Sequence, residues 1–324
     1  MAVSDRSPLR EVRSLSGRLR IGDWIFAGLV GLAAVVVVVV IFGLFYELIS
    51  NSWLSITAFG AGFVWNTEWN PPREVFGAGA LVVGTIITSL AALALATLVG
   101  VLVALYLTQV APDWLARPIS YMVELLAAIP SVVYGLWGIF VLGLFIRDEF
   151  GPVFVDTLGW IPFFDGTPLV TGLFTAIIIL SIMILPTVTA VSRDVLAAVP
   201  GSQREGVLAL GATRWEMITM SVLPYARSGV LGAAILGLAR AVGETLAVTM
   251  VIGNRVAIPG TIFDPAYTMP SIIANQFAEV ENDMHASALL EVGLLLLVLT
   301  FVINVIARLL VWRVTNGQRA VVQE

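Results

Sequence analysis

The feature that most constrains this chain is a series of long apolar runs without charged residues. The run from Trp24 to Tyr46 contains no charge, and neither does the run from Val75 to Pro112. About 20 such residues, at 1.5 Å each, span the roughly 30 Å hydrocarbon core of a bilayer. A secretory signal has an apolar stretch of only about 7–15 residues. The run that begins at Trp24 therefore predicts a first transmembrane helix that is retained.

The composition supports a membrane protein and excludes several kinds of site. Of the 324 residues, 59% are apolar and 12% are charged, whereas soluble domains have about 45–50% and about 25%. There is no cysteine, which excludes thiol catalysis and thiolate metal sites. His285 is the single histidine, so a histidine-based zinc site or a Ser/His/Asp triad has little to build on. We expect no metal, no cofactor and no catalytic residue.

The basic residues show whether this chain could itself form a P-loop for ATP. All 17 of them are arginine, and the sequence contains no lysine. A P-loop of the form GxxxxGK[ST] places its lysine on the β- and γ-phosphates of the nucleotide. This chain cannot form one, so an ATPase that drove transport would be a separate polypeptide.

The apolar runs predict an all-α integral membrane fold with six transmembrane helices. Charged and Pro/Gly-rich segments separate the runs, and loops are expected at 50–76, 147–168 and 254–286. We expect a cytoplasmic segment 1–23, a permease domain 24–312 with its core at about 75–312, and a cytoplasmic tail 313–324. The spans are expected at 24–46, 75–112 as one long helix, 119–146 interrupted at Pro130, 169–192, 228–253 and 287–310.

The arginines predict the orientation of these spans. If the N-terminus is cytoplasmic, thirteen arginines lie on the inner side and only Arg73, Arg147 and Arg255 lie in outer loops. Loops that stay in the cytoplasm carry an excess of arginine and lysine. Both termini and the polar segment 193–227 are therefore expected in the cytoplasm of a multi-pass plasma (inner) membrane protein.

The polar segment between two apolar runs, Gly201–Pro224, has a helix-start pattern. We expect Ser202 to cap a short helix with Glu205 near its first turn, and Gly211 to end it. The apolar residues Val207, Leu208 and Leu210 would be poorly covered unless a partner docks on them. The alternative is an amphipathic loop that lies on the bilayer surface.

This segment resembles the EAA loop of ABC importer permeases, whose pattern is E-A-A-x3-G-x9-I-x-L-P. Glu205, Gly211, Leu223 and Pro224 match at that spacing, whereas Gly206, Val207 and Ser221 depart from it. The resemblance implies a short helix that sits in a groove of the ATPase and transmits its motion. The implied coupling residues are Arg204, Glu205, Gly206, Leu208, Ala209, Gly211, Ala212 and Pro224.

Two further stretches extend the resemblance over about residues 60–312. They are SGVLGAAILGLARAVGETLAVTMVIGN at Ser228–Asn254 and ELLAAIPSVVYG at Glu124–Gly135. Both are similar to the PstC-type permeases of the high-affinity phosphate ABC importer. The resemblance implies a type I importer permease of the MetI-like kind that carries phosphate and binds no nucleic acid. It also implies a second homologous permease subunit, a dimer of cytoplasmic ATPase subunits and an extracytoplasmic phosphate-binding protein, all in membrane lipid.

The charged pair Arg240 and Glu244 lies inside the fifth predicted span. In a regular helix these two residues, four apart, share one face near the bilayer midplane. The residues alone leave two interpretations open, an ion pair that only joins helices or an anion site in which Glu244 orients Arg240. The resemblance favours a place in the substrate path. Ser131 and Tyr134 could line that path, with core packing as the alternative.

Other polar residues give weaker signals, and two rival functions remain. We expect His285 to be a solvated loop residue, and Glu124 and Glu291 to be interfacial. One rival is a permease of the same architecture for sulfate, molybdate or phosphonate. The other is a secondary transporter or a membrane-embedded enzyme, although no inverted repeat is evident in the sequence.

Overall fold

The structure is a computed structural model that describes residues 9–321, with side chains described for residues 23–313. Helices are the only extended secondary structure in this part of the chain. Its two β-bridges, Asn70–Val75 and Gly253–Ala266, are isolated. The elements are α1 (Leu9–Phe59), α2 (Gly62–Trp65), η1 (Pro71–Arg73), α3 (Gly79–Leu105), η2 (Tyr106–Val110), α4 (Asp113–Ala127), α5 (Ser131–Trp137), η3 (Gly138–Gly143), η4 (Ile146–Phe150), α6 (Gly151–Leu158), α7 (Leu173–Ala197), α8 (Gly201–Ala209), α9 (Arg214–Met217), η5 (Ile218–Val222), α10 (Leu223–Gly243), α11 (Leu246–Val251), α12 (Met269–Gln276), η6 (Phe277–Glu279) and α13 (Asp283–Val321).

The chain divides into two compact units, Met1–Asn51 and Ser52–Glu324. In the first unit the described residues form one continuous helix, the greater part of α1, which contains the uncharged run 24–46. The predicted terminal segments 1–23 and 313–324 lie outside the residues with described side chains, apart from Asp23 and Arg313.

In the described part of the chain, six helices are long and apolar enough to cross a membrane, as predicted. The prediction of one long helix for 75–112 is also confirmed, because α3 continues directly into the π-helical turn η2. The six spans are Asp23–Phe59, Gly79–Val110, Ser131–Leu158, Leu173–Ala197, Arg214–Gly243 and Asp283–Arg313.

The third predicted span, 119–146, was misplaced. Residues up to Ala127 form a separate amphipathic helix, α4, and the membrane-length helix begins at Ser131. The break falls at Pro130, whose own backbone is extended (φ −59°, ψ 139°). A proline also disfavours helical geometry in the residue before it, so α4 ends ahead of Pro130. The new helix then continues through η3, η4 and α6 to Leu158, so the predicted loop 147–168 begins only after that residue.

Other predicted boundaries also change. Helix α1 runs on to Phe59, into the predicted loop 50–76, and α12 forms inside the predicted loop 254–286. The fifth span begins at Arg214 rather than at 228. It ends at Gly243, where a regular helix to 253 was expected.

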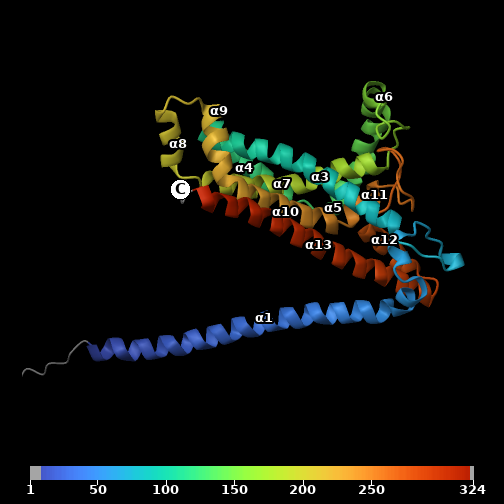
Figure 1. The fold of residues 1–324 in the computed structure, drawn as a ribbon, viewed down its shortest axis with the longest axis horizontal. Helices are drawn as coiled ribbons and strands as arrows, with labels where there is room; N and C mark the ends of the chain where they lie inside the picture. The colour runs from blue at the N-terminus through green and yellow to red at the C-terminus, as the bar shows by residue number, and fades with distance from the viewer. Residues whose placement is uncertain (1–8, 322–324) are drawn as a thin grey trace, which may run out of the picture. The chain divides into compact units, whose positions relative to one another are not determined.

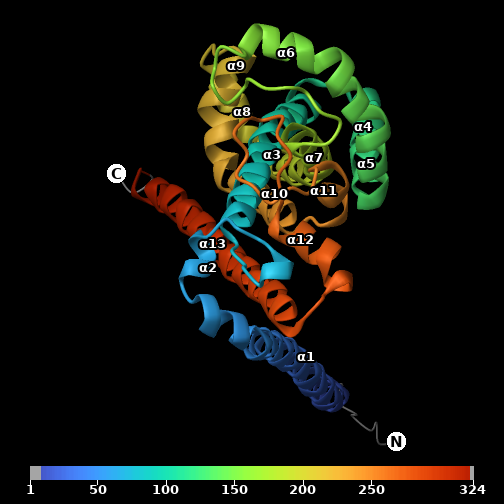
Figure 2. The same ribbon diagram turned by 90° about the vertical axis from the view of Figure 1, so that its right-hand side faces the viewer.

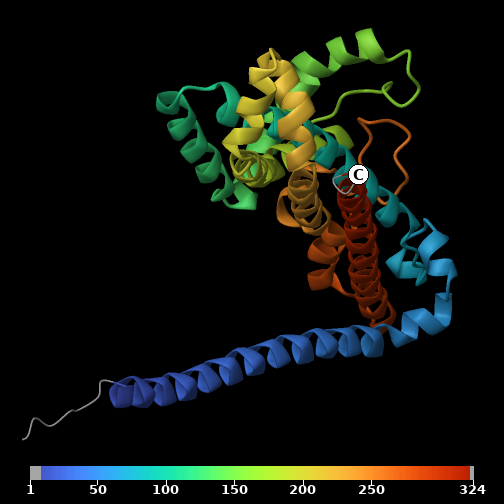
Figure 3. The ribbon, with the colours of Figure 1, turned by 60° about the vertical axis from the view of Figure 1, so that its left-hand side comes forward.

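Helix α7 is the centre of the second unit. It contacts α3, α10, α4 and α11, and most of its side chains are buried, including those of Leu180, Met183 and Ile184. In Figures 2 and 3 the green helices α4 and α5 lie on one side of this bundle and the red helix α13 on another.

The short helices mark the two ends of this unit. Helices α8 and α9 lie at one end, together with the C-terminal end of α13 (Figure 1). Helices α6 and α12 lie at the other end (Figure 1). The length of the helical bundle therefore separates the predicted coupling segment from the predicted outer loops.

Candidate functional site

Arg240 is the charged residue in the last turn of α10. Its side chain is half-buried, and its Nη1 donates a hydrogen bond to Oγ1 of Thr187 on α7, at 3.3 Å. Among the described residues, no carboxylate lies within ion-pair distance of its guanidinium. An arginine inside a membrane is costly unless it faces a partner or a polar cavity, so this guanidinium is suited to receive an anion.

The structure corrects the predicted geometry of Glu244. Helix α10 ends at Gly243, and Glu244 is extended (φ −70°, ψ 127°), so Arg240 and Glu244 do not share a helix face. Oε1 of Glu244 instead accepts a hydrogen bond from the backbone N–H of Ala247, at 3.2 Å. Because the first N–H groups of a helix have no partner within it, this carboxylate stabilises the start of α11.

A second helix break lies beside the first. The hydroxyl of Tyr134 on α5 donates to the carbonyl oxygen of Leu126 on α4, at 2.9 Å, and so bridges the break at Pro130. The helices that follow the two breaks, α5 and α11, pack against each other.

Gly135 is the point where α5 meets α11. A Cβ atom at this position would lie 2.6 Å from Sδ of Met250 and 3.3 Å from Cα of Ala247. A side chain there would require Met250 to move its side chain and α11 to give way by a few tenths of an ångström. The absence of a side chain therefore allows the close contact between α5 and α11.

The four predicted path residues thus lie beside the two breaks, Ser131 and Tyr134 at the start of α5 and Arg240 and Glu244 at the end of α10. Ser131 is the first residue of α5 and is half-buried, and Tyr134, one turn later, is buried. The prediction missed Thr187, which directly follows Pro186 within α7. A hydroxyl next to a proline inside an apolar run was the available signal. The part that each residue has in transport stays a prediction.

The segment Gly201–Pro224 begins with a short helix that ends near Gly211, as predicted, and a turn then leads into a second short helix, α9. Helix α8 ends at Ala209, and Gly211 follows in the left-handed region (φ +86°). The cap prediction was wrong, because Pro200, with its fixed φ, precedes the helix and Ser202 lies inside it without a capping hydrogen bond. A capping box that the prediction missed, between Thr213 and Glu216, begins α9.

The predicted coupling residues divide into an inward and an outward group. Nη2 of Arg204 donates to the carbonyl oxygen of Leu196 at the end of α7, at 2.9 Å, and thereby ties α8 to α7. Two apolar residues outside the predicted set, Leu210 and Trp215, face outward and are 89% and 69% exposed. Glu205, Gly206, Leu208, Ala209 and Gly211 are also exposed, and Ala212 and Pro224 are half-buried. The structure thus presents an apolar surface at one end of the bundle.

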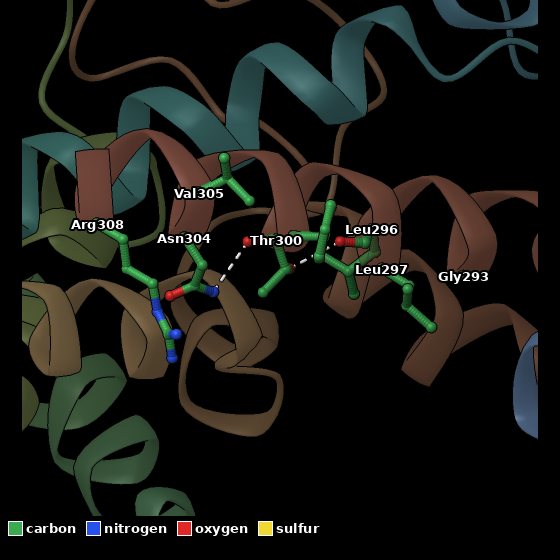
Figure 4. Close-up of a pocket in the computed structure, with 8 residues that line it drawn as sticks. Gly293, Leu296, Leu297, Thr300, Asn304, Val305 and Arg308 are labelled. Atoms are coloured by element: carbon green, nitrogen blue, oxygen red, sulfur yellow. Dashed lines mark hydrogen bonds between the residues drawn. The ribbon is translucent and has the colours of Figure 1, made fainter. Parts of the chain in front are cut away.

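A hollow in the described part of the chain lies elsewhere, along α13. It measures about 770 Å³, and the polar residues Thr300, Asn304 and Arg308 follow one another along its wall (Figure 4). Nδ2 of Asn304 donates to the backbone oxygen of Thr300, at 2.9 Å. None of the predicted path residues lines this hollow.

His285 and Glu291 are both more buried than predicted. His285 lies in α13, is only 2% exposed, and stacks on Phe76 with 5.5 Å between ring centroids. Its Nε2 lies 3.1 Å from Oε1 of Gln276. Glu291 is buried in the same helix, while Glu124 is exposed and pairs with Arg193 at 2.9 Å. The solvated position predicted for His285 was wrong because α12 and the segment around Phe76 cover it.

Known proteins match this chain over most of its length. Residues 96–316 match the family described as binding-protein-dependent transport system inner membrane component. The phosphate transport system permease protein PstC of Haemophilus influenzae is 41% identical over 91% of this chain and 95% of its own length. PstC of Mesorhizobium japonicum is 42% identical over 92% of both chains.

The fold is also similar to that of a solved ABC transporter chain. A chain of the inward-facing MetNI methionine ABC transporter superposes with a TM-score of 0.53 at 21% identity, over 76% of this chain and 99% of its own. That likeness shows the type I importer permease fold, as predicted. The chain therefore belongs to the family of binding-protein-dependent transport system inner membrane components, in the branch of the PstC permeases.

Proposed function

We propose that this chain is a membrane-spanning permease subunit of an ATP-driven importer and carries inorganic phosphate into the cytoplasm. The observation that carries the proposal is the guanidinium of Arg240, which faces Thr187 and has no carboxylate partner in the described structure. Guanidinium groups bind phosphate oxygens in bidentate geometry. The identity to PstC permeases of other bacteria supports phosphate as the anion.

The partners follow from the two ends of the bundle. The exposed apolar residues Leu208, Leu210 and Trp215 would dock on a dimer of cytoplasmic ATPase subunits. An extracytoplasmic phosphate-binding protein would deliver the anion at the opposite end, and a second homologous permease subunit would complete the path. The name of the family, a binding-protein-dependent transport system, supports this assembly.

The proposed location is the inner membrane, with both termini in the cytoplasm. The excess of arginine in the segments assigned to the inner side supports this orientation. In this arrangement 1–23 and 313–324 are cytoplasmic, 24–312 form the permease domain, and 193–227 form the coupling loop. The position of α8 and α9 at the same end as the close of α13 agrees with it (Figure 1).

A mechanical connection leads from the docking surface to Arg240. Arg204 ties α8 to the end of α7, and α7 also carries Thr187, the partner of Arg240. ATP-driven closure of the ATPase dimer would move α8, and α7 would transmit the motion to the anion site. The result is alternating access, in which this chain moves the anion and performs no covalent chemistry.

The test is ATP-dependent uptake by the complex reconstituted in vesicles with its ATPase and binding protein. Labelled phosphate, sulfate and molybdate are compared with and without ATP. Phosphate uptake that needs ATP supports the proposal, uptake of another oxyanion contradicts the substrate, and uptake without ATP contradicts the coupling. Arg240→Ala should abolish uptake while the ATPase still co-purifies, and normal phosphate uptake by this variant would refute the role of Arg240.

A further inference from the structure

We propose that Thr187 is a positioning residue for the anion site, which holds the guanidinium of Arg240 in place from a neighbouring helix. The inference rests on the proposed function, because it assigns a role within that site. Its geometric basis is the hydrogen bond from Nη1 of Arg240 to Oγ1 of Thr187, at 3.3 Å.

The hydroxyl of Thr187 behaves differently from most other hydroxyls in these helices. Serine and threonine in a helix usually bond the carbonyl four residues earlier, as Thr85, Thr88, Ser181 and Thr300 do at 2.6–2.7 Å. The hydrogen bond of Thr187 in the described structure goes to another helix, to Arg240. Its oxygen is therefore used between helices rather than within α7.

The backbone of α7 lacks one hydrogen-bond donor at this point. Pro186, the residue before Thr187, is buried inside the helix. A proline in a helix interior has no N–H, removes one backbone hydrogen bond and bends the helix. Thr187 therefore follows a position without a backbone N–H in the most buried of the six spans, and α7 packs against α10.

The chemistry of the pair suits an anion. Thr187 accepts one of the five N–H donors of Arg240, and the remaining donors stay available. The hydroxyl hydrogen of Thr187 is not used in that bond, so it can be donated to an oxygen of the same anion. Thr187 would thus fix the plane of the guanidinium before the anion arrives, which matters because bidentate recognition requires a defined orientation.

The experiment compares three substitutions in the reconstituted complex. Thr187→Val keeps the shape and removes the hydroxyl, and Thr187→Ser keeps the hydroxyl. Thr189→Val is the matched control, because Thr189 is buried in the same helix and its Oγ1 has no hydrogen-bond partner. Initial rates of labelled phosphate uptake and of ATP hydrolysis are measured over a range of loaded binding protein.

We expect Thr187→Val to lower the maximal uptake rate about ten- to a hundredfold, with the ATPase still bound and hydrolysing ATP. Thr187→Ser should recover most of that loss, and Thr189→Val should transport like the unchanged chain. Uptake by Thr187→Val at the unchanged rate would overturn the inference. Equal defects in Thr187→Val and Thr187→Ser would also overturn it, because they would show that keeping the hydroxyl does not preserve transport.

Transport by the complex with the unsubstituted chain distinguishes a failure of the proposed function from a failure of this inference. If it carries an oxyanion other than phosphate, the proposed substrate is wrong, and the same variants are then compared with the anion that is carried. If Thr187→Val does not assemble, Thr187→Ala provides a second chain without the hydroxyl. An uptake rate of Thr187→Ala as high as that of Thr187→Ser would then overturn the inference.

Discussion

Replacing Gly84 with alanine should destabilise the second unit, because α3 touches backbone at that position. A Cβ atom on Gly84 would lie 2.1 Å from the carbonyl oxygen of Tyr267, in the segment that leads into α12. Contacts of a Cβ below 3.0 Å essentially never occur, so the helix and this segment must separate by roughly 0.9 Å or more. The obstacle is backbone, and it cannot rotate away as a side chain could.

The cost can be worked out from the neighbouring contacts. Overpacking of a tight interior costs about 1–3 kcal/mol. The adjacent hydroxyl oxygen, Oγ1 of Thr85, accepts a buried hydrogen bond from the backbone N–H of Met269 at 2.9 Å, and the same separation would weaken it by about 1 kcal/mol. Gly84→Ala should therefore lower the free energy of unfolding by about 2–4 kcal/mol.

The assay is denaturant unfolding of the purified chain in detergent, followed by circular dichroism. Gly232→Ala is the control, since no heavy atom lies within 4 Å of a Cβ at that position in α10. In a helix interior this change should stabilise by about 0.5–1 kcal/mol. If the two variants unfold at the same denaturant concentration, the close contact of Gly84 with Tyr267 is refuted.

Two further substitutions test the site and the coupling segment. Tyr134→Phe removes the hydroxyl that donates to the carbonyl of Leu126, which keeps its hydrogen bond from the N–H of Ile129 at 3.3 Å. It should therefore cost about 0.5–1.5 kcal/mol of unfolding free energy and lower phosphate uptake, and unchanged values of both would contradict the bridge. Gly211→Ala should cost about 1–2 kcal/mol, because φ is +86° there with open space around it. It should also weaken binding of the ATPase in a pull-down, whereas Gly206→Ala, with no positive φ and equally open space, should be neutral or stabilising in the unfolding assay.

The number of spans could be predicted because it depends on a local property, the absence of charge over a membrane-length run. Gly211 could also be predicted to end a helix, since a left-handed residue after a helix favours glycine. The boundary at Ser131 was missed although Pro130 was noticed, because a proline can either kink a helix or end it. In this chain the bond between Tyr134 and Leu126 stabilises the ended form.

Other features had local signals that were not used. Thr268, Pro270 and Ser271 form a helix start with a capping box, which would have indicated α12 inside the predicted loop. The burial of His285 had no such signal. It depends on Phe76 and Gln276, which reach it from other parts of the chain. A polar residue beside acidic neighbours in sequence can thus be buried by partners that sequence spacing does not reveal.

The break at Glu244 matters most for function, and it is the least predictable feature. Glu244 follows Arg240 by four positions, and a continuous helix would make them a neutral pair inside the membrane. The helix stops because Glu244 caps Ala247 and because Gly135 lets α11 pack on α5. A neutral pair would give an anion little reason to bind, whereas the observed break leaves the guanidinium of Arg240, among the described residues, with a hydrogen bond to Thr187 and no carboxylate within ion-pair distance. Since an uncompensated cation in a membrane is costly, that cost would favour the arrival of an anion, which is the step that the proposed phosphate path requires.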